Sequence, residues 1–367
     1  MEDRYKKIIF LLCSLFVFSV AKAENPPFFS GYVDGSYNYL LNSNEFVSST
    51  NDRLYDLEEN GLTLQQVALI FQKLPDQGLG FYSDFIGGRD ANELAPLGWN
   101  PYFGSQTLAV VARDVHLQYT RDALTFSAGL QQSLMGVEDD LYINNTNFSH
   151  SILNNVAEPG QSITLRLTVK PNDQLTLTAG ASNGWSTIEE AGRLTTMELG
   201  GSYNFNKVLS LSVQYSDGPQ SVYGDDLGGL SGVRQMMSVI FTYHATPKLD
   251  FISDVDYATQ SKALLLDGQM GGVLWKGIAQ YVNYKWTDQW ATSFRADVFS
   301  DRDGFRTGVQ QTWSEATVTL AYQMFKSFLL RAETRHDFSN TNAFFTSNHL
   351  GTSNHQQSYA LEGLYRF

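Results

Sequence analysis

The sequence has little cysteine, no excess of positive charge and no long apolar run beyond its first 20 residues. Its only cysteine is Cys13, so a chain that loses this segment has no disulfide and no thiolate chemistry. Acidic residues outnumber basic ones by 38 to 25, giving a net charge of −13. This balance argues against nucleic-acid binding, which needs basic patches. A helical membrane protein is also disfavoured, because each spanning helix needs ~18 or more apolar residues in a row.

Residues 1–23 have the organisation of a secretory signal peptide. Arg4, Lys6 and Lys7 form a basic region near its start, an apolar stretch (8–20) follows, and the segment ends in Ala-Lys-Ala, a small-x-small cleavage site. A lipoprotein acylated on Cys13 is disfavoured, because apolar residues continue well past it. We therefore expect an exported protein of residues 24–367, with 21 basic against 36 acidic residues and a net charge of −15.

Apolar and polar residues alternate along the chain, most clearly at its C-terminus. In residues 358–367 one parity is apolar and aromatic, while the other carries Glu362 and Arg366. An apolar outer face and a polar inner face are typical of a transmembrane β-barrel wall. An aromatic last residue is similar to the end of bacterial outer-membrane barrels. We expect this strand to insert into the membrane and to be recognised by the barrel-assembly machinery through Tyr359, Leu361, Tyr365 and Phe367.

Short and long connections alternate between the predicted strands. Pro, Asn and Asp favour tight bends, and the short turns are predicted near 75–76, 121–122, 171–173, 204–206, 246–247, 287–288 and 325–326. The longer, Asn-, Asp-, Ser- and Gly-rich stretches are 41–60, 88–113, 133–160, 184–193, 217–231, 259–270, 301–309 and 337–356. Short turns on one side and long loops on the other are typical of outer-membrane barrels, with the short turns in the periplasm.

Seven short and eight long connections predict an all-β fold, a transmembrane antiparallel β-barrel of about sixteen strands. The chain from residue 24 forms one domain with both termini on the periplasmic side. The last strand should pair with the first, which begins at Phe28. The strands predicted over 62–73 and 273–286 are the least regular, and residues 108–112 fit either a short helix or an extension of a strand. Fourteen strands therefore remain an alternative.

The parity opposite to the apolar one should line the lumen, which at sixteen strands is wide enough to hold water. The third long loop, residues 132–160, either folds inward and narrows the channel or lies outside in solvent. Folded inward, it would place three acidic residues opposite wall arginines and create a transverse field. The predicted pore-lining residues are Glu138, Asp139, Asp140, Arg166, Lys170, Asp254, Arg295, Asp297, Glu315, Arg331, Glu333 and Arg335.

Residues 128–186 resemble the OmpL-like β-barrel porin family of bacterial outer membranes. The segments that carry the resemblance are Ala128-Gly129, Gly136-Val137-Glu138, the run from Asn144 to Ser151, and Asn183-Gly184-Trp185. The stretch in which they lie covers about a sixth of the chain. His150, Ser186 and Leu130 depart from the arginine, aspartate and lysine expected at these positions. The resemblance implies a channel in the outer membrane of a Gram-negative bacterium and does not imply a particular substrate.

The residues favour a porin-like channel over an enzyme. His116 has no assignable serine and acid partners, and the spacing of His336, His349 and His355 matches no standard metal site. We therefore expect no cofactor, no metal and no catalysis. The predicted function is passive diffusion of small hydrophilic solutes or ions with weak cation preference, in contact with outer-membrane lipid and lipopolysaccharide. A structural or adhesin-type barrel with a closed pore is the alternative, and monomer and homo-oligomer both remain open.

Overall fold

The computed structural model describes residues 28–41, 53–56, 60–95, 109–188, 196–221, 230–345 and 352–367. The predicted signal peptide lies outside these residues. None of the helices formed by the described residues is long and apolar enough to cross a membrane.

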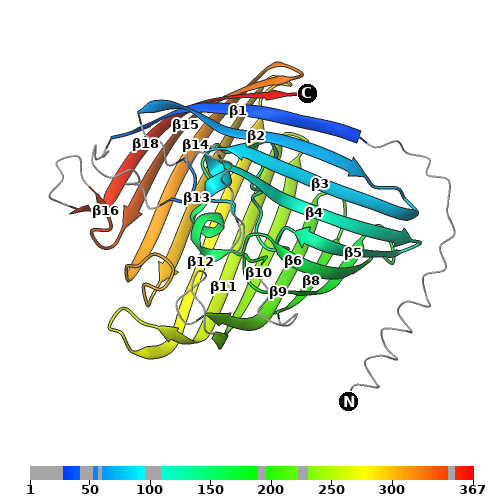
Figure 1. Cartoon of the computed structure of the whole chain (residues 1–367). Helices are drawn as coiled ribbons and strands as arrows, with labels where there is room; N and C mark the ends of the chain where they lie inside the picture. The colour runs from blue at the N-terminus through cyan, green and yellow to red at the C-terminus, as the bar shows by residue number, and fades with distance from the viewer. Residues whose placement is uncertain are drawn as a thin grey trace.

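Sixteen antiparallel strands form a closed barrel (Figure 1). Each strand pairs with its neighbours in the chain, and β1 closes the barrel against β18, with Gly35 opposite Gly363. The barrel strands are β1 (Phe28–Leu40), β2 (Gly61–Lys73), β3 (Gly78–Gly88), β4 (Ala109–Arg121), β5 (Leu124–Gln131), β6 (Ser162–Val169), β7 (Leu175–Ser182), β8 (Thr196–Asn204), β9 (Leu209–Ser221), β10 (Leu230–Thr246), β11 (Leu249–Leu264), β12 (Met270–Lys285), β13 (Trp290–Asp301), β14 (Gln311–Phe325), β15 (Phe328–Ser339) and β18 (His355–Arg366). The predicted closure of the last strand on the first is confirmed.

The connections contain the few other elements. The loop between β3 and β4 has a short 3-10 helix, η1 (Asp90–Asn92), and the loop between β15 and β18 has a small hairpin of β16 (Phe344–Phe345) and β17 (Thr352–Ser353). The loop between β5 and β6 is the longest and is called L3 here (residues 132–161). It contains a 3-10 turn, η2 (Tyr142–Asn144), and a π-helical turn, η3 (Leu153–Ala157).

The predicted turns and strands agree with the structure throughout the chain. Each of the seven predicted short turns joins two barrel strands, and sixteen strands replace the alternative of fourteen. Three predicted boundaries were wrong. The long connection expected to reach residue 113 ends earlier, because Ala109–Arg121 form β4. Residues 109–112 therefore extend a strand and do not form the short helix that was the alternative. The connections expected to begin at residues 217 and 259 begin later, because β9 continues to Ser221 and β11 to Leu264.

The two faces of the barrel wall differ as the alternation predicts. Large apolar side chains are exposed on the outside, as at Leu199 on β8 and Val213 on β9. The outward residues of the last strand follow the same rule, with Tyr359, Leu361, Tyr365 and Phe367 between 47% and 62% exposed. The opposite parity of the same strand holds buried Ser358, Glu362 and Leu364. An exposed apolar belt of this kind is stable only against lipid.

Candidate pore constriction

L3 folds into the lumen of the barrel. Figure 1 shows its green coil and the η3 turn enclosed by the strands. The middle of the loop is fully covered by protein, since the side chains from Asn147 to Leu153 are no more than 2% exposed. A buried loop must satisfy its own backbone polar groups, and here charged side chains of the wall supply the partners.

Arginines of β13 and β15 bind the backbone carbonyls of L3. Arg295 on β13 donates to the carbonyl of Ser149 at 2.5 Å. On β15, Arg331 donates to the carbonyl of Asn147 at 2.6 Å, and Arg335 to that of His150 at 2.6 Å. A guanidinium has five N–H donors in a rigid fork, so one side chain can hold several carbonyls in place.

Acidic residues of the same wall accept hydrogen bonds from the backbone amides of L3. Glu333 on β15 accepts from the amides of Phe148 at 2.7 Å and Ser149 at 3.0 Å. Asp297 on β13 accepts from the amide of Ile152 at 2.8 Å. The wall thus offers donors to the carbonyls of L3 and acceptors to its amides, and these charge-assisted bonds are stronger than neutral ones.

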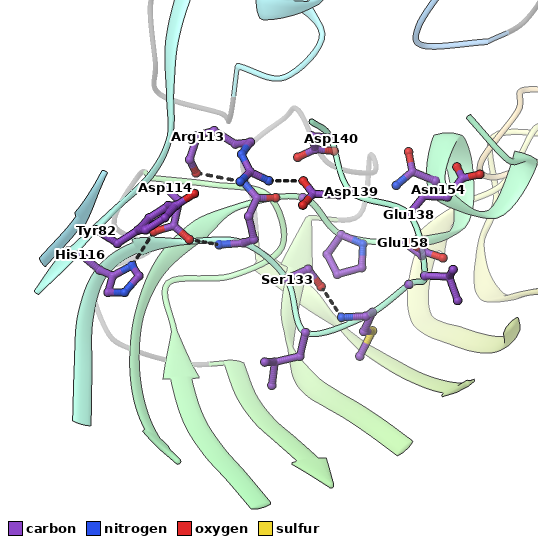
Figure 2. A pocket seen from close by; sticks show the side chains of 17 residues that line it. Tyr82, Arg113, Asp114, His116, Ser133, Glu138, Asp139, Asp140, Asn154 and Glu158 are labelled. Atoms are coloured by element: carbon purple, nitrogen blue, oxygen red, sulfur yellow. Dashed lines mark hydrogen bonds and ion pairs between the residues drawn. The ribbon is translucent and has the colours of Figure 1, made fainter. Parts of the chain in front are cut away.

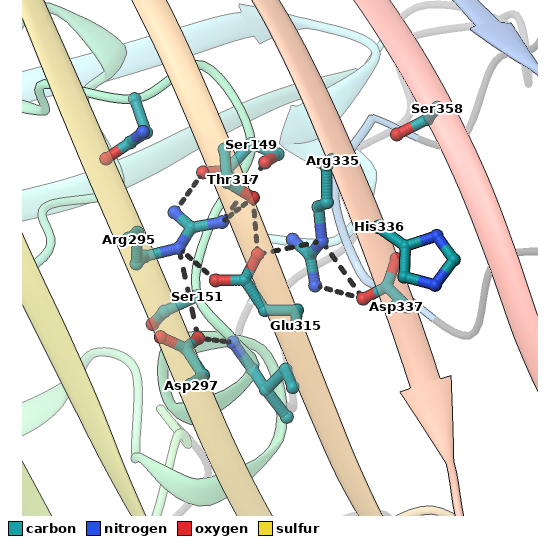
Figure 3. Close-up of polar contacts among 12 residues, drawn as sticks. Ser149, Ser151, Arg295, Asp297, Glu315, Thr317, Arg335, His336, Asp337 and Ser358 are labelled. Atoms are coloured by element: carbon teal, nitrogen blue, oxygen red, sulfur yellow. Dashed lines mark hydrogen bonds and ion pairs between the residues drawn. The ribbon is translucent and has the colours of Figure 1, made fainter.

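The wall charges also pair with one another under the loop (Figure 3). Glu315 on β14 lies between two arginines, 2.6 Å from Arg295 Nε and 3.6 Å from Arg335 Nε. Arg335 also pairs with Asp337 at 2.8 Å. These side chains are fully buried, so every charge needs its partner and removal of one member is costly.

The wall on the other side of the lumen has a different composition. Several inward side chains of β6–β9 are buried, such as Thr164, Arg166 and Ser182, and many others are polar and only half-buried. Among them are Thr168, Thr176, Thr178, Glu198, Gly200, Ser202, Ser210, Ser212 and Gln214. The interior is therefore divided into a charged part, covered by L3, and a part lined with small polar groups that solvent can reach.

A cavity of about 460 Å³ lies between L3 and β4. Arg113 on β4 lies 2.5 Å from Asp139 (Figure 2) and also 2.5 Å from Asp84, so it bridges two carboxylates. Asp114 lies 2.5 Å from the ring of His116 on the same strand. The formal charges at this cavity are mainly negative, because Arg113 is outnumbered by the acidic side chains that it faces.

The sequence and fold comparisons agree with this architecture. The family described as "Putative beta-barrel porin-2, OmpL-like" matches residues 28–367, which is nearly the whole chain. The protein is a member of this OmpL-like porin family. Family and fold together indicate the bacterial outer membrane.

Solved outer-membrane channels share the fold of this porin. The outer membrane channel DcaP of Acinetobacter baumannii covers 95% of this chain and 99% of its own, with a TM-score of 0.65 and 15% identity. The anion-selective porin from Comamonas acidovorans covers 93% and 99%, with a TM-score of 0.65 and 10% identity. OmpT of Vibrio cholerae, in its trimer form, covers 93% and 99%, with a TM-score of 0.57 and 11% identity. No curated protein matches this sequence.

The predicted acidic residues of L3 lie in three different environments. Glu138 is buried against Arg295, 2.8 Å away. Burial opposes its ionisation, but the charge of Arg295 outweighs burial and lowers the pKa of this carboxyl. Asp139 pairs with Arg113 and remains partly exposed. Asp140 is buried beside the hydroxyl of Tyr55, at 3.3 Å, and burial raises its pKa.

The predicted transverse field is therefore wrong in its geometry. Only Glu138 meets one of the three wall arginines, and it does so in direct contact. Arg331 and Arg335 bind carbonyls of L3 instead of its carboxylates. The wall arginines hold the loop and do not face acidic residues across open water.

The remaining predicted pore-lining residues are scattered around the wall. Arg166 on β6 pairs with Glu198 at 2.9 Å, facing the open part of the lumen. Lys170 lies one residue past β6, exposed in the short turn. Asp254 on β11 accepts a hydrogen bond from the amide of Val137 at 3.0 Å. Asp297, Glu315 and Glu333 lie beneath L3, as described above.

Two functional candidates were missed at the sequence level. Arg113 lies at the end of a predicted loop, and the alternation breaks there because the register of β3 and β4 shifts between Asp84 and Phe85, opposite this residue. Glu158 lies in L3, where no periodic pattern indicates which side chains face the wall. Burial and the acidic neighbours Asp256 and Asp254 raise the pKa of this carboxyl well above its usual range.

Proposed function

We propose that this porin is a passive diffusion channel for small hydrophilic solutes and ions, with a weak preference for cations. The observation that carries the proposal is the division of the lumen. L3 is bound to the charged wall of β13–β15, and many Thr, Ser and Gly residues on the inward face of β6–β9 are only half-buried. A solute would pass along that wall, where small hydroxyl side chains replace water contacts without binding tightly.

The charge at the narrow part supports the cation preference. Asp114 and Asp139 line the cavity with Arg113, while the arginines of β13 and β15 are buried in ion pairs and loop contacts. Charged groups lining a pore act on passing ions over distances of about one Debye length, ~8 Å at physiological salt. An excess of exposed acidic groups should therefore raise the local concentration of cations.

The reactivity of cysteines introduced on β9 tests the proposed path of solutes through the lumen. Ser212 on β9 faces the lumen, and its neighbour Val213 faces outward and is 39% exposed. We expect a charged methanethiosulfonate reagent added to bilayers to reduce the current of Ser212→Cys channels and to leave Val213→Cys and wild-type channels unchanged. Equal effects on the two variants, or no effect on Ser212→Cys, would contradict the proposed path.

A closed structural or adhesin-type barrel is the alternative function. The dense contacts of L3 with the wall favour it, because they leave one side of the lumen filled with protein. Reconstituted protein that never conducts would support this alternative.

The trimer form of OmpT suggests that this porin also assembles as a homo-oligomer, which cross-linking in native membranes would test. Contacts with lipopolysaccharide and with the barrel-assembly machinery stay predictions.

A further inference from the structure

Three buried carboxylates meet where the end of L3 contacts the wall. Glu158 belongs to L3, and Asp254 and Asp256 are inward residues of β11. Carboxylate oxygens of the three side chains lie within 4.8 Å of one another. Their exposed fractions are 9%, 1% and 1%, so water cannot screen their charges.

The neighbours of these carboxylates do not compensate their charge. The amide of Val137 and the hydroxyl of Ser238 donate to Asp254, at 3.0 and 3.3 Å. Both carboxylate oxygens of Asp256 are buried and have no hydrogen-bond partner among the described residues. A buried ionised carboxylate without a partner is strongly destabilising, and no positive group among the described residues is paired with these three side chains.

The backbone of L3 is shaped to bring Glu158 into the cluster. Gly136 has a φ of +87°, and a Cβ at this position would lie 1.9 Å from Glu158 Oε2. A side chain at position 136 would therefore occupy the place of the carboxylate. The two ends of L3 meet here, because Val137 follows this glycine and donates to Asp254.

We propose that Glu158, Asp254 and Asp256 bind one divalent cation, with Ca²⁺ as the preferred ion. Carboxylate oxygens are hard ligands, and the two free oxygens of Asp256 permit the bidentate contact that Ca²⁺ often uses. Three carboxylates from a loop and one strand give an irregular ligand set, which Ca²⁺ accepts more readily than Mg²⁺ with its strict octahedral geometry. The bound ion would fasten both ends of L3 to β11.

Terbium luminescence measures binding at this site without any need for conduction. Tb³⁺ replaces Ca²⁺ at oxygen sites, and Trp275, which donates to the carbonyl of Ala157 next to Glu158, would sensitise its emission. The protein is refolded in detergent without lipopolysaccharide, stripped with EDTA and titrated with TbCl₃, followed by CaCl₂ or MgCl₂. We expect one Tb³⁺ per chain, displaced by Ca²⁺ at far lower concentration than by Mg²⁺.

Two variants and a matched control assign the signal to the cluster. Asp256→Asn and Glu158→Gln should weaken Tb³⁺ binding at least tenfold, and their heat-modifiable migration on gels should show that they fold. Asp267→Asn makes the same change in the exposed β11–β12 loop and should bind as the wild type does. A wild-type protein without calcium-displaceable emission, or an Asp256→Asn variant that binds as tightly as wild type, overturns the proposal and indicates that the acids share protons instead.

Discussion

Single charged residues hold the interior of this porin together, and Arg295 is the most connected of them. Its guanidinium pairs with Glu138 and Glu315 and donates to the carbonyl of Ser149. The sequence predicted the lumen position of Arg295 from strand parity alone. For the case that L3 folds inward, the prediction also set Glu138, Asp139 and Asp140 opposite the wall arginines, and of these contacts only the one between Glu138 and Arg295 is observed.

Replacement of Arg295 should therefore destabilise the folded barrel. Arg295→Met leaves the buried carboxylate of Glu138 without its cation and removes the closer of the two arginines beside Glu315. The loss of one partner from a buried ion pair typically costs about 3–5 kcal/mol. Urea unfolding in lipid vesicles, followed by tryptophan fluorescence, measures the change. Arg302→Met is the control, because Arg302 is exposed in the next loop and surface pairs contribute little. Equal unfolding midpoints for the two variants would show that the buried network contributes no stability.

At the scale of elements, strands and turns could be predicted because their signals are local. The period of two separates Leu199 from its lumen-facing neighbours, and Pro171 with Asn172 and Asp173 marks a tight bend, as observed between β6 and β7. The course of L3 could not be predicted in the same way. L3 is held through its backbone carbonyls and amides, which are bound by wall residues more than 140 positions away in the sequence. Every residue has such backbone groups, so the sequence does not indicate which of them will be bound.

Two variants on neighbouring strands, one on the outer face and one on the lumen face, test whether the outer face contacts lipid and the lumen holds water. Leu199 on β8 is 43% exposed on the outer face, while Thr178 on β7 is half-buried on the lumen side. Leu199→Arg should cost about 2–4 kcal/mol if its position lies near the bilayer midplane, whereas Thr178→Arg should change stability little, because a wet lumen accepts charge. Folding titrations in vesicles of both variants check this. A larger loss for Thr178→Arg would mean that this side of the lumen is dry.

The whole molecule combines a charged wall that binds L3 with a half-buried polar wall along which we propose that solutes pass. Family membership and the shared barrel fold agree with this arrangement. The fold could be predicted almost completely from alternation and turn chemistry. The constriction was predicted only in part, since L3 enters the lumen as one of the two expected positions but the wall arginines bind it instead of facing it across water.

The central claim is an open path with an excess of exposed acidic groups, and planar-bilayer recording tests it most directly. Purified protein is inserted into a bilayer with EDTA present and a KCl gradient across it, and both the conductance and the reversal potential are measured. We predict stepwise opening of ion-conducting channels and a reversal potential displaced toward that of K⁺. A barrel that stays closed, or a reversal potential displaced toward that of Cl⁻, would contradict this account.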